Sequence, residues 1–246
     1  MAVVISGGTR GIGLEIAARL AIPGETVVMG YRDDHDTARI AADRIAAIGA
    51  DPVAVAVDLG TPTGAQQLIA AVPNGETIRQ LVHCAVQLVK GDAIDADPGV
   101  FQHAVNVNGM ALYHLAHAAA PAMQAGALVL FISSRGARVV VPQDYAAVGI
   151  GKATAEAIVR YLAVELGPRG VRVNAISPGA LDTATVRALF GDRTEEVLAD
   201  KVQRVPMRRG IEHEDYLGLV DWLASPAASM VTGAMIPVYG GGDLLG

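Results

Sequence analysis

Tyr145 and Lys152 are the residues of this chain whose types and spacing most directly suggest chemistry. They stand seven positions apart within residues 143–153. Because an α-helix turns by about 100° per residue, the two side chains would leave a helix on nearly the same face. A phenol has an ordinary pKa of about 10, and a nearby ammonium group lowers that pKa by stabilising the phenolate. The pair predicts a proton donor beside a cation, and the alternative is a solvated helical face that happens to carry both residues.

Length and composition indicate one large α/β domain over residues 1–246, because a chain of 246 residues can bury a substantial core without a second domain. Its hydrophobic content of 52% and charged content of 18% describe a compact protein rather than a disordered one. The net charge of −6 disfavours a nucleic-acid partner.

The sequence contains no apolar run of the roughly 18 residues that a membrane span needs, and its amino terminus lacks the pattern of a secretory leader. We therefore expect a soluble, cytoplasmic protein that has no membrane partner. The single cysteine, Cys84, excludes an internal disulfide and a thiolate cage, and His83 has no second ligand at metal spacing, so no metal site is expected.

A glycine-rich stretch directly follows the first apolar run, residues 2–5. The sequence Ser-Gly-Gly-Thr-Arg-Gly-Ile-Gly occupies positions 6–13, and an apolar helical pattern continues from 14 to 22. In this context Gly7, Gly11 and Gly13 let the backbone turn tightly, and the free amides at the start of the helix suit a pyrophosphate. The stretch predicts a nucleotide site that uses the loop residues Gly7, Thr9, Arg10, Gly11, Ile12 and Gly13; the alternative is a merely tight strand-to-helix connection.

Arg32 ends the next expected strand, residues 26–31. In dinucleotide folds the side chain near this position reads the adenosine ribose, and an arginine favours a 2′-phosphate. Together with Arg10 in the loop, Arg32 predicts a preference for NADP(H) over NAD(H). The alternative is that Asp33 or Asp34 pairs with Arg32 on the surface.

The alternation of strands and helices continues along the chain. Further strands are expected at residues 52–57, 81–85, 128–132, 171–176 and 233–238, with helical patterns at 36–48, 63–72, 101–123 and around Tyr145 and Lys152. Strands separated by helices pair in parallel through right-handed crossovers. The expected fold is therefore a doubly wound, Rossmann-type parallel sheet of seven strands in a single domain.

The chain resembles the short-chain dehydrogenase/reductase family over essentially its whole length. The resemblance rests on the loop at 6–13 and on five later motifs, Asp58-Leu59, Val105-Asn106-Val107-Asn108-Gly109, Ile132-Ser133-Ser134, Val173-Asn174-Ala175 and the segment Ser177 to Thr183. It implies a nicotinamide cofactor, with Asp58 and Leu59 beside the adenine, Cys84 and Ala85 on the cofactor side, and Pro178, Gly179, Ala180 and Thr183 beside the nicotinamide. It also implies a homotetramer or homodimer.

The spacing of tyrosine and lysine separates groups within this family. Members that reduce ketones carry the tyrosine four residues before the lysine, but that position here is Val148, which has no proton to give. The spacing of Tyr145 and Lys152 resembles that of the NADPH-dependent enoyl-acyl-carrier-protein reductases and enoyl-CoA reductases of short-chain type. The resemblance implies reduction of an α,β-unsaturated acyl thioester in fatty acid or polyketide biosynthesis.

The resemblance also assigns roles to the site residues. Tyr145 would hydrogen-bond the thioester oxygen, where negative charge develops, and Lys152 would hold the ribose hydroxyls of the cofactor. Asn106 resembles the residue that supports the lysine; the alternative is a polar residue that satisfies a kinked helix. Ser134, eleven residues before Tyr145, is either a carbonyl donor or simply the serine that ends a strand.

Three departures and one variable segment leave alternatives open. His83-Cys84 stands where the family usually has two asparagines, and Tyr239 stands where it usually has an acid. Residues 183–207 are expected to cover the acyl site. Six cations in or just after this segment would attract an acyl carrier protein or coenzyme A, or form an ordinary solvated surface: Arg187, Arg193, Lys201, Arg204, Arg208 and Arg209. A carbonyl or hydroxyl oxidoreductase that uses Tyr145, and a non-catalytic NADP-binding protein, are the alternative functions.

Overall fold

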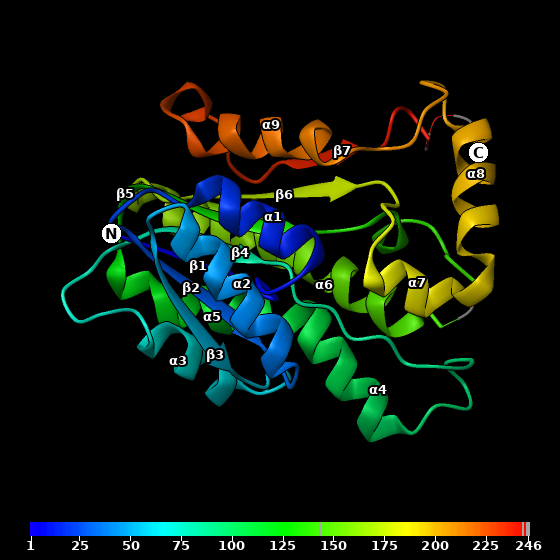
Figure 1. The fold of residues 1–246 in the computed structure, drawn as a ribbon, viewed down its shortest axis with the longest axis horizontal. Helices are drawn as coiled ribbons and strands as arrows, with labels where there is room; N and C mark the ends of the chain where they lie inside the picture. The colour runs from blue at the N-terminus through cyan, green and yellow to red at the C-terminus, as the bar shows by residue number, and fades with distance from the viewer. Residues whose placement is uncertain (143, 243, 245–246) are drawn as a thin grey trace.

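One sheet of seven parallel strands, in the order β3-β2-β1-β4-β5-β6-β7, runs through the described part of the chain (Figure 1). The computed structural model describes residues 1–142, 144–242 and 244, so Gln143, at the edge of the stretch around Tyr145, lies outside it. The strands are β1 Ala2–Ser6, β2 Thr26–Tyr31, β3 Asp51–Ala56, β4 Ile78–His83, β5 Met123–Ile132, β6 Arg172–Pro178 and β7 Met235–Val238. The doubly wound, Rossmann-type sheet expected from the sequence is confirmed.

Helices cover both faces of the sheet, so the central strands are largely buried. All five residues of β1 and all seven residues of β6 are buried. On one face α1 Gly11–Leu20, α2 His35–Ala47 and α9 His213–Ala224 form a core with the sheet. On the other face the core is closed by α3 Pro62–Ala70, α5 Ala111–Ala119 and α6 Ala146–Leu166, with α4 Pro98–Val105 against α6.

Two helices stand apart from these layers. Helix α7 Ala184–Phe190 and helix α8 Thr194–Arg204 lie beyond the carboxyl ends of the strands, at the right in Figure 1. They fall within the segment that the sequence predicts to cover the substrate. Short helical segments complete the path: a π-helix at Asn106–Met110 and 3-10 turns at Ala120–Ala122, Arg135–Ala137, Gly167–Arg169, Gly191–Arg193 and Pro226–Ala228.

The structure corrects the sequence analysis at two places. The helix expected over 101–123 is divided by the π-helix Asn106–Met110, and Met123 already belongs to β5. Helix α9 was not predicted; Glu212 and Asp215 form a capping box at its start, but a glutamate at the N-cap is not the usual sequence signature. Among the described residues, no helix is long and apolar enough to cross a membrane.

Candidate active site

A cavity of about 1490 Å³ opens where the strands end, between the sheet and the helices α7 and α8. Ligands of parallel α/β sheets bind at this edge because the loops after the strands converge there. The cavity is lined by these residues predicted from the sequence: Gly7, Thr9, Arg10, Gly11, Ile12, Arg32, Asp58, Leu59, Cys84, Ala85, Ser134, Tyr145, Lys152, Pro178, Gly179, Ala180 and Thr183. Gly13 and Asn106 do not line it.

The glycine-rich loop fits a dinucleotide. Gly7 and Gly11 have φ angles of 67° and 53°, in the left-handed region that favours glycine. A Cβ on Gly7 would lie 2.8 Å from the Cα of Ala85, and one on Gly13 would overlap the carbonyl of Gly7. The absence of a side chain at Gly13 therefore allows α1 to pack closely against the glycine-rich loop. Because α1 begins at Gly11, the unpaired amides of its first turn face the loop, where a pyrophosphate would sit.

The two arginines expected at the adenosine end of the cavity have different partners. Arg32 Nη1 donates a 3.0 Å hydrogen bond to Gln87 Oε1, whereas Arg10 lies 3.8 Å from the carboxylate of Asp34. Asp34 also accepts a hydrogen bond from the backbone of Thr37 and thereby caps α2. Among the described residues, neither Asp33 nor Asp34 forms an ion pair with Arg32, so the surface alternative is not the arrangement seen here, and Arg32 lines the cavity.

Asp58 belongs to a side-chain network that sequence reasoning missed. Its carboxylate lies 2.9 Å from His103 Nε2 and accepts a hydrogen bond from Gly60 N. The other ring nitrogen of His103 lies 3.0 Å from the Gln87 amide that also holds Arg32. Burial would raise the pKa of Asp58, but the hydrogen bonds from Gly60 and His103 outweigh it and lower that pKa. The network links the predicted adenine residue to the predicted 2′-phosphate residue.

Lys152 is buried at the centre of the site. Its side chain is 6% exposed, its Nζ donates a 2.6 Å hydrogen bond to the carbonyl of Ile132, and the ammonium lies 5.4 Å from the ring centre of Phe131. Burial lowers the pKa of Lys152 to about 8, while Cys84 and Glu156 act in the opposite direction. A buried cation at the cavity wall can hold cofactor hydroxyls and stabilise developing negative charge.

Tyr145 is not part of the helix that carries Lys152. Helix α6 begins at Ala146, and Tyr145 is its N-cap residue, with φ −111° and ψ −6°. These angles remain close enough to helical ones for Gly149 N to donate a 2.8 Å hydrogen bond to the Tyr145 carbonyl. The phenol ring lies against Gly136, where an added Cβ would overlap the ring. The two side chains therefore line one cavity, as predicted, although a regular helix does not fix the tyrosine.

The expected lowering of the Tyr145 pKa is wrong for this structure. Burial raises that pKa, and the nearby Ser134 hydroxyl offsets part of the rise. Because the Lys152 ammonium is engaged with the Ile132 carbonyl, the lysine does not stabilise a phenolate here. Tyr145 is consequently a protonated phenol at neutral pH, able to donate a hydrogen bond. Ser134 Oγ is buried and has no hydrogen-bond partner of good geometry among the described residues.

A family profile described as "Enoyl-(Acyl carrier protein) reductase" matches residues 7–242. The chain is 31% identical to the 7alpha-hydroxysteroid dehydrogenase of Escherichia coli (strain K12) over 246 residues, 97% of this chain and 92% of that protein. It is 28% identical to the 1-cyclohexenylcarbonyl-CoA reductase of Streptomyces collinus over 240 residues, 97% of this chain and 85% of that protein. The chain belongs to the short-chain dehydrogenase/reductase family.

The solved structures give the same result for the fold. A short-chain dehydrogenase from Burkholderia cenocepacia J2315, solved in complex with NADP, superposes with a TM-score of 0.87 at 27% identity. The match covers 98% of this chain and 97% of that chain. BdcA, solved in complex with NADPH, superposes with a TM-score of 0.82 at 30% identity, over 97% of this chain and 93% of that chain. These comparisons support an oxidoreductase that uses a nicotinamide cofactor.

The departure of this short-chain dehydrogenase/reductase at His83 and Cys84 is accommodated by burial. His83 is fully buried, its Nδ1 lies 2.6 Å from Ser6 Oγ, and its ring stacks on Phe131. Burial, with Lys152 nearby, lowers the pKa of His83 to about 3, so the ring is neutral at physiological pH. Burial also raises the pKa of Cys84 to about 11, which leaves an unreactive thiol at the cavity wall.

Asn106, predicted to support the lysine, is less buried than Asn108 of the same motif. The Asn106 side chain reaches Gly60 and Gln102 on the outer side of the π-helix. Asn108 is fully buried, and its amide exchanges hydrogen bonds of 3.0 and 2.8 Å with the backbone N and O of Gln87. Both asparagines belong to the same motif, and the π-helix decides which of them is buried.

A buried carboxylate supports the lysine from the next turn of α6. Glu156 accepts a 2.6 Å hydrogen bond from Ser133 Oγ and forms an ion pair with Arg138 at 3.4 Å. Arg138 also donates a 3.3 Å hydrogen bond to the hydroxyl of Tyr239, the residue that replaces the family's usual acid. Sequence reasoning missed this network, although Glu156 stands four residues after Lys152, which is one helical turn.

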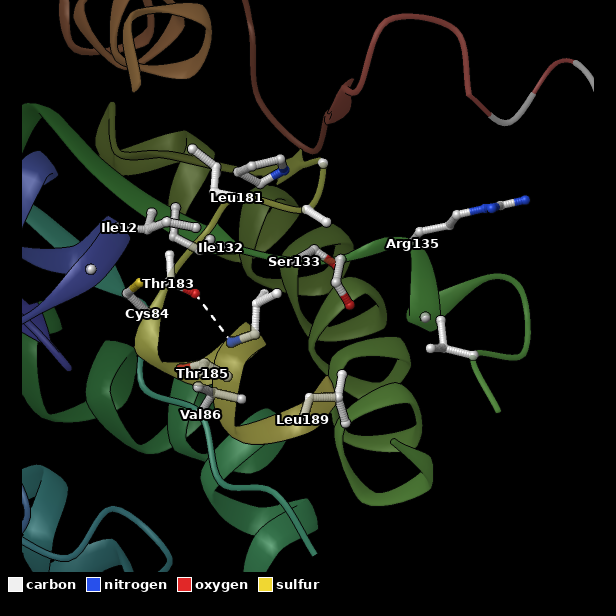
Figure 2. Close-up of a pocket in the computed structure, with 18 of the residues that line it drawn as sticks. Ile12, Cys84, Val86, Ile132, Ser133, Arg135, Leu181, Thr183, Thr185 and Leu189 are labelled. Atoms are coloured by element: carbon white, nitrogen blue, oxygen red, sulfur yellow. Dashed lines mark hydrogen bonds between the residues drawn. The ribbon is translucent and has the colours of Figure 1, made fainter. Parts of the chain in front are cut away.

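The segment after β6 lines the cavity beside the glycine loop, where a Cβ on Gly11 would lie 3.9 Å from the side chain of Thr183. The Thr183 hydroxyl accepts a hydrogen bond from Val186 N and thereby caps α7, drawn as the dashed line in Figure 2. Thr183 thus connects the cofactor side to the covering helices. Several residues of the covering segment line the cavity, among them Leu189, Phe190, Val197, Leu198 and Val202.

Local ion pairs occupy most of the cations that were considered for an acyl carrier. The pairs are Arg187–Asp182, Arg193–Glu196, Arg204–Asp200 and Arg209–Asp215. Lys201 instead lies 5.2 Å from the ring centre of Phe190. These contacts agree with the solvated-surface interpretation of the arginines. The described residues contain no cluster of three or more side chains that could hold a metal ion.

Proposed function

We propose that this protein reduces the carbon–carbon double bond of an α,β-unsaturated acyl thioester with NADPH. One observation carries the proposal. Val148 occupies the position of the tyrosine in ketone-reducing relatives and is fully buried, whereas Tyr145 lines the cavity with Lys152. The proton donor is thus displaced by most of a helical turn from the position suited to a ketone.

The chain's residues have separate roles in this reaction. When bound, the nicotinamide supplies a hydride to the β-carbon of the substrate. Tyr145, a protonated phenol at neutral pH, donates a hydrogen bond to the thioester oxygen, where negative charge develops. Its proton then passes to the enolate to complete the reduction, and solvent returns a proton to the phenolate. Lys152 binds the ribose hydroxyls and keeps the site positive, and the apolar covering segment excludes water from the acyl group.

Similar proteins support the reaction class and the cofactor. The matching family profile carries an enoyl reductase description, and the relative from Streptomyces collinus acts on an enoyl-CoA by its name. Arg32 and Arg10 at the adenosine end of the cavity favour the 2′-phosphate of NADPH over the bare hydroxyl of NADH. The carrier is either acyl carrier protein or coenzyme A, and the reaction would serve fatty acid or polyketide biosynthesis.

A carbonyl or hydroxyl oxidoreductase is the second candidate. The buried Ser134 hydroxyl lies near Tyr145 and has no hydrogen-bond partner of good geometry within the described part of the chain, as a second donor to a substrate carbonyl would. The galactitol 2-dehydrogenase (L-tagatose-forming) of Cereibacter sphaeroides, 34% identical over 96% of this chain, supports the same possibility. The position of Tyr145 favours the enoyl reaction.

Purified protein should be mixed with NADPH and either a crotonyl or an acetoacetyl thioester, each on coenzyme A and on acyl carrier protein. The absorbance of NADPH is followed. We expect oxidation of NADPH with the crotonyl thioester. Oxidation with the ketone alone would favour the second candidate, and tight NADPH binding without any turnover would favour a non-catalytic NADP-binding protein.

We also propose that the protein is a cytoplasmic homotetramer or homodimer. Tyr161 and Val164 on α6 are 73% and 76% exposed, and Tyr113 on α5 is 42% exposed. Large apolar side chains gathered on neighbouring helices are typical of an interface. Light scattering after size-exclusion chromatography tests the oligomeric state, and a monomer at micromolar concentration would contradict it.

A further inference from the structure

The position of Tyr145 depends on the residues before it, because the tyrosine precedes the first turn of α6. The residue just before it, Asp144, has a φ angle of 52°. This left-handed conformation is uncommon for residues other than glycine, although aspartate and asparagine tolerate it best. Such a conformation persists only where surrounding contacts hold it, and it is often found at functional sites.

The Asp144 side chain supplies such a contact. Its Oδ1 accepts a 2.6 Å hydrogen bond from Gly91 N, in the loop that connects β4 to α4. Its Oδ2 lies 3.9 Å from the Nζ of Lys90 in the same loop. The side chain of Asp144 is 21% exposed, so the hydrogen bond is partly shielded from water. The loop after β4 therefore anchors the backbone that presents Tyr145.

Lys90 extends this connection to the covering segment. Its Nζ donates a 2.8 Å hydrogen bond to the carbonyl of Ala188, in the last turn of α7. A cation at a helix C-terminus satisfies a carbonyl that lacks a partner within the helix and complements the negative end of the helix dipole. Lys90 is thus shared between Asp144 and α7.

We propose that Lys90 and Asp144 form a clasp that positions Tyr145 and holds α7 over the acyl site. Asp144 acts as a positioning residue for the phenol of Tyr145. Lys90 links the position of α7 to that of Tyr145, because it contacts both Ala188 and Asp144. The kinetic part of this inference rests on the proposed function, because it takes Tyr145 as the proton donor; the structural part does not. Neither residue touches the expected cofactor site.

Substitutions at Asp144 test the positioning role. Asp144→Ala removes the bond to Gly91, and a misplaced proton donor should lower kcat by about 10- to 100-fold while the NADPH dissociation constant is retained. Asp144→Asn keeps an oxygen for Gly91 N and tolerates the left-handed backbone, so it should restore most of kcat. Asp95→Asn, an exposed change in the β4–α4 loop, is the matched control. An Asp144→Ala enzyme with the kcat of the wild type would refute the positioning role.

Proteolysis tests the hold on α7 without using activity. Lys90→Met removes the bond to Ala188, so trypsin should cleave faster after Arg187 and Arg193, whereas Arg39→Met on the distant surface of α2 should leave that rate unchanged. Mass spectrometry of the fragments identifies the cleavage sites. If trypsin cleaves Lys90→Met at the rate of the wild type, the clasp is refuted. This result does not depend on the Asp144→Ala variant, so it holds even if that variant fails to fold. If the wild type reduces no enoyl thioester, the proposed function fails, but this measurement still decides whether the clasp exists.

Discussion

The cofactor half and the acyl half of the cavity are built in different ways. In the cofactor half, a tight glycine loop packs against the sheet, and the side chains of Lys152 and His83 are buried and hydrogen-bonded to Ile132 and Ser6. In the acyl half, Val140 is 91% exposed although it lines the cavity, and the covering helices carry ion pairs at their surface. Burial thus organises the cofactor half in advance, whereas the acyl half leaves apolar surface for a substrate to cover.

The largest expected effects on activity come from Tyr145 and Lys152, which lie where the two halves of the cavity meet. Tyr145→Phe should lower kcat by about 10²- to 10⁴-fold, the usual contribution of a positioned proton donor, and should leave NADPH affinity intact. Lys152→Met should weaken both, because the lysine belongs to the cofactor half. NADPH absorbance gives kcat, and the fluorescence of bound NADPH gives affinity.

A Phe variant that turns over as fast as the wild type would remove Tyr145 from the mechanism. If Lys152→Met bound NADPH normally, the assignment of Lys152 to the cofactor half would be wrong, and the lysine would belong to the acyl half.

Arg32→Ala should act only within the cofactor half. Hydrogen bonds to charged groups contribute about 1.5–3 kcal/mol, so NADPH affinity should fall by about 10- to 150-fold. NADH lacks the 2′-phosphate, and its affinity should stay nearly the same. The matched control is Arg39→Ala, whose arginine pairs with Asp43 on the surface of α2. An equal loss of affinity for both cofactors would contradict the role given to Arg32.

His83→Asn tests how strongly the cofactor half depends on burial. The pKa of His83 is about 3 in the folded protein, against an ordinary value of 6.5. Between these pH values the unfolded chain binds a proton that the folded protein does not, so stability falls as the pH drops, by at most about 1.4 kcal/mol per pH unit. The His83→Asn variant has no histidine at this position, so its stability does not fall with pH for this reason.

Urea unfolding at pH 7 and at pH 5 measures the effect. At pH 7 the variant should be less stable by about 1–3 kcal/mol, because the contact with Phe131 is lost. At pH 5 the difference between the two proteins should shrink. A difference that is the same at both pH values would mean that folding does not lower the pKa of His83.

The two halves also differ in how far the sequence predicts them. The glycine loop and Lys152 could be placed from the sequence because their roles depend on local backbone geometry and on neighbouring turns. Helix α9 was missed because its capping box, Glu212 and Asp215, lacks the residue types of the usual signature. The contacts of Gln87 and His103 join distant segments and could not be seen.

The exact setting of Tyr145 and the choice of asparagine were also beyond the sequence. The spacing of Tyr145 and Lys152 is the same whether α6 begins before or after the tyrosine, but only a later start makes the phenol depend on Asp144 and Gly136. Asn106 and Asn108 are two residues apart, and the π-helix decides which of them is buried. The direction of the Tyr145 pKa depended on burial, which no motif reports.

Val140→Asp should produce the smallest effect and the one most specific to the acyl half. If an acyl chain covers the exposed Val140 side chain, burying it contributes about 1.5 kcal/mol, so a charged replacement should raise KM for a long-chain enoyl thioester by about 10-fold. A crotonyl thioester is too short to cover this residue, and its KM should change less. NADPH affinity should not change, because the cofactor half is separate. If the variant has the KM of the wild type for both thioesters, the acyl chain leaves the cavity by another route.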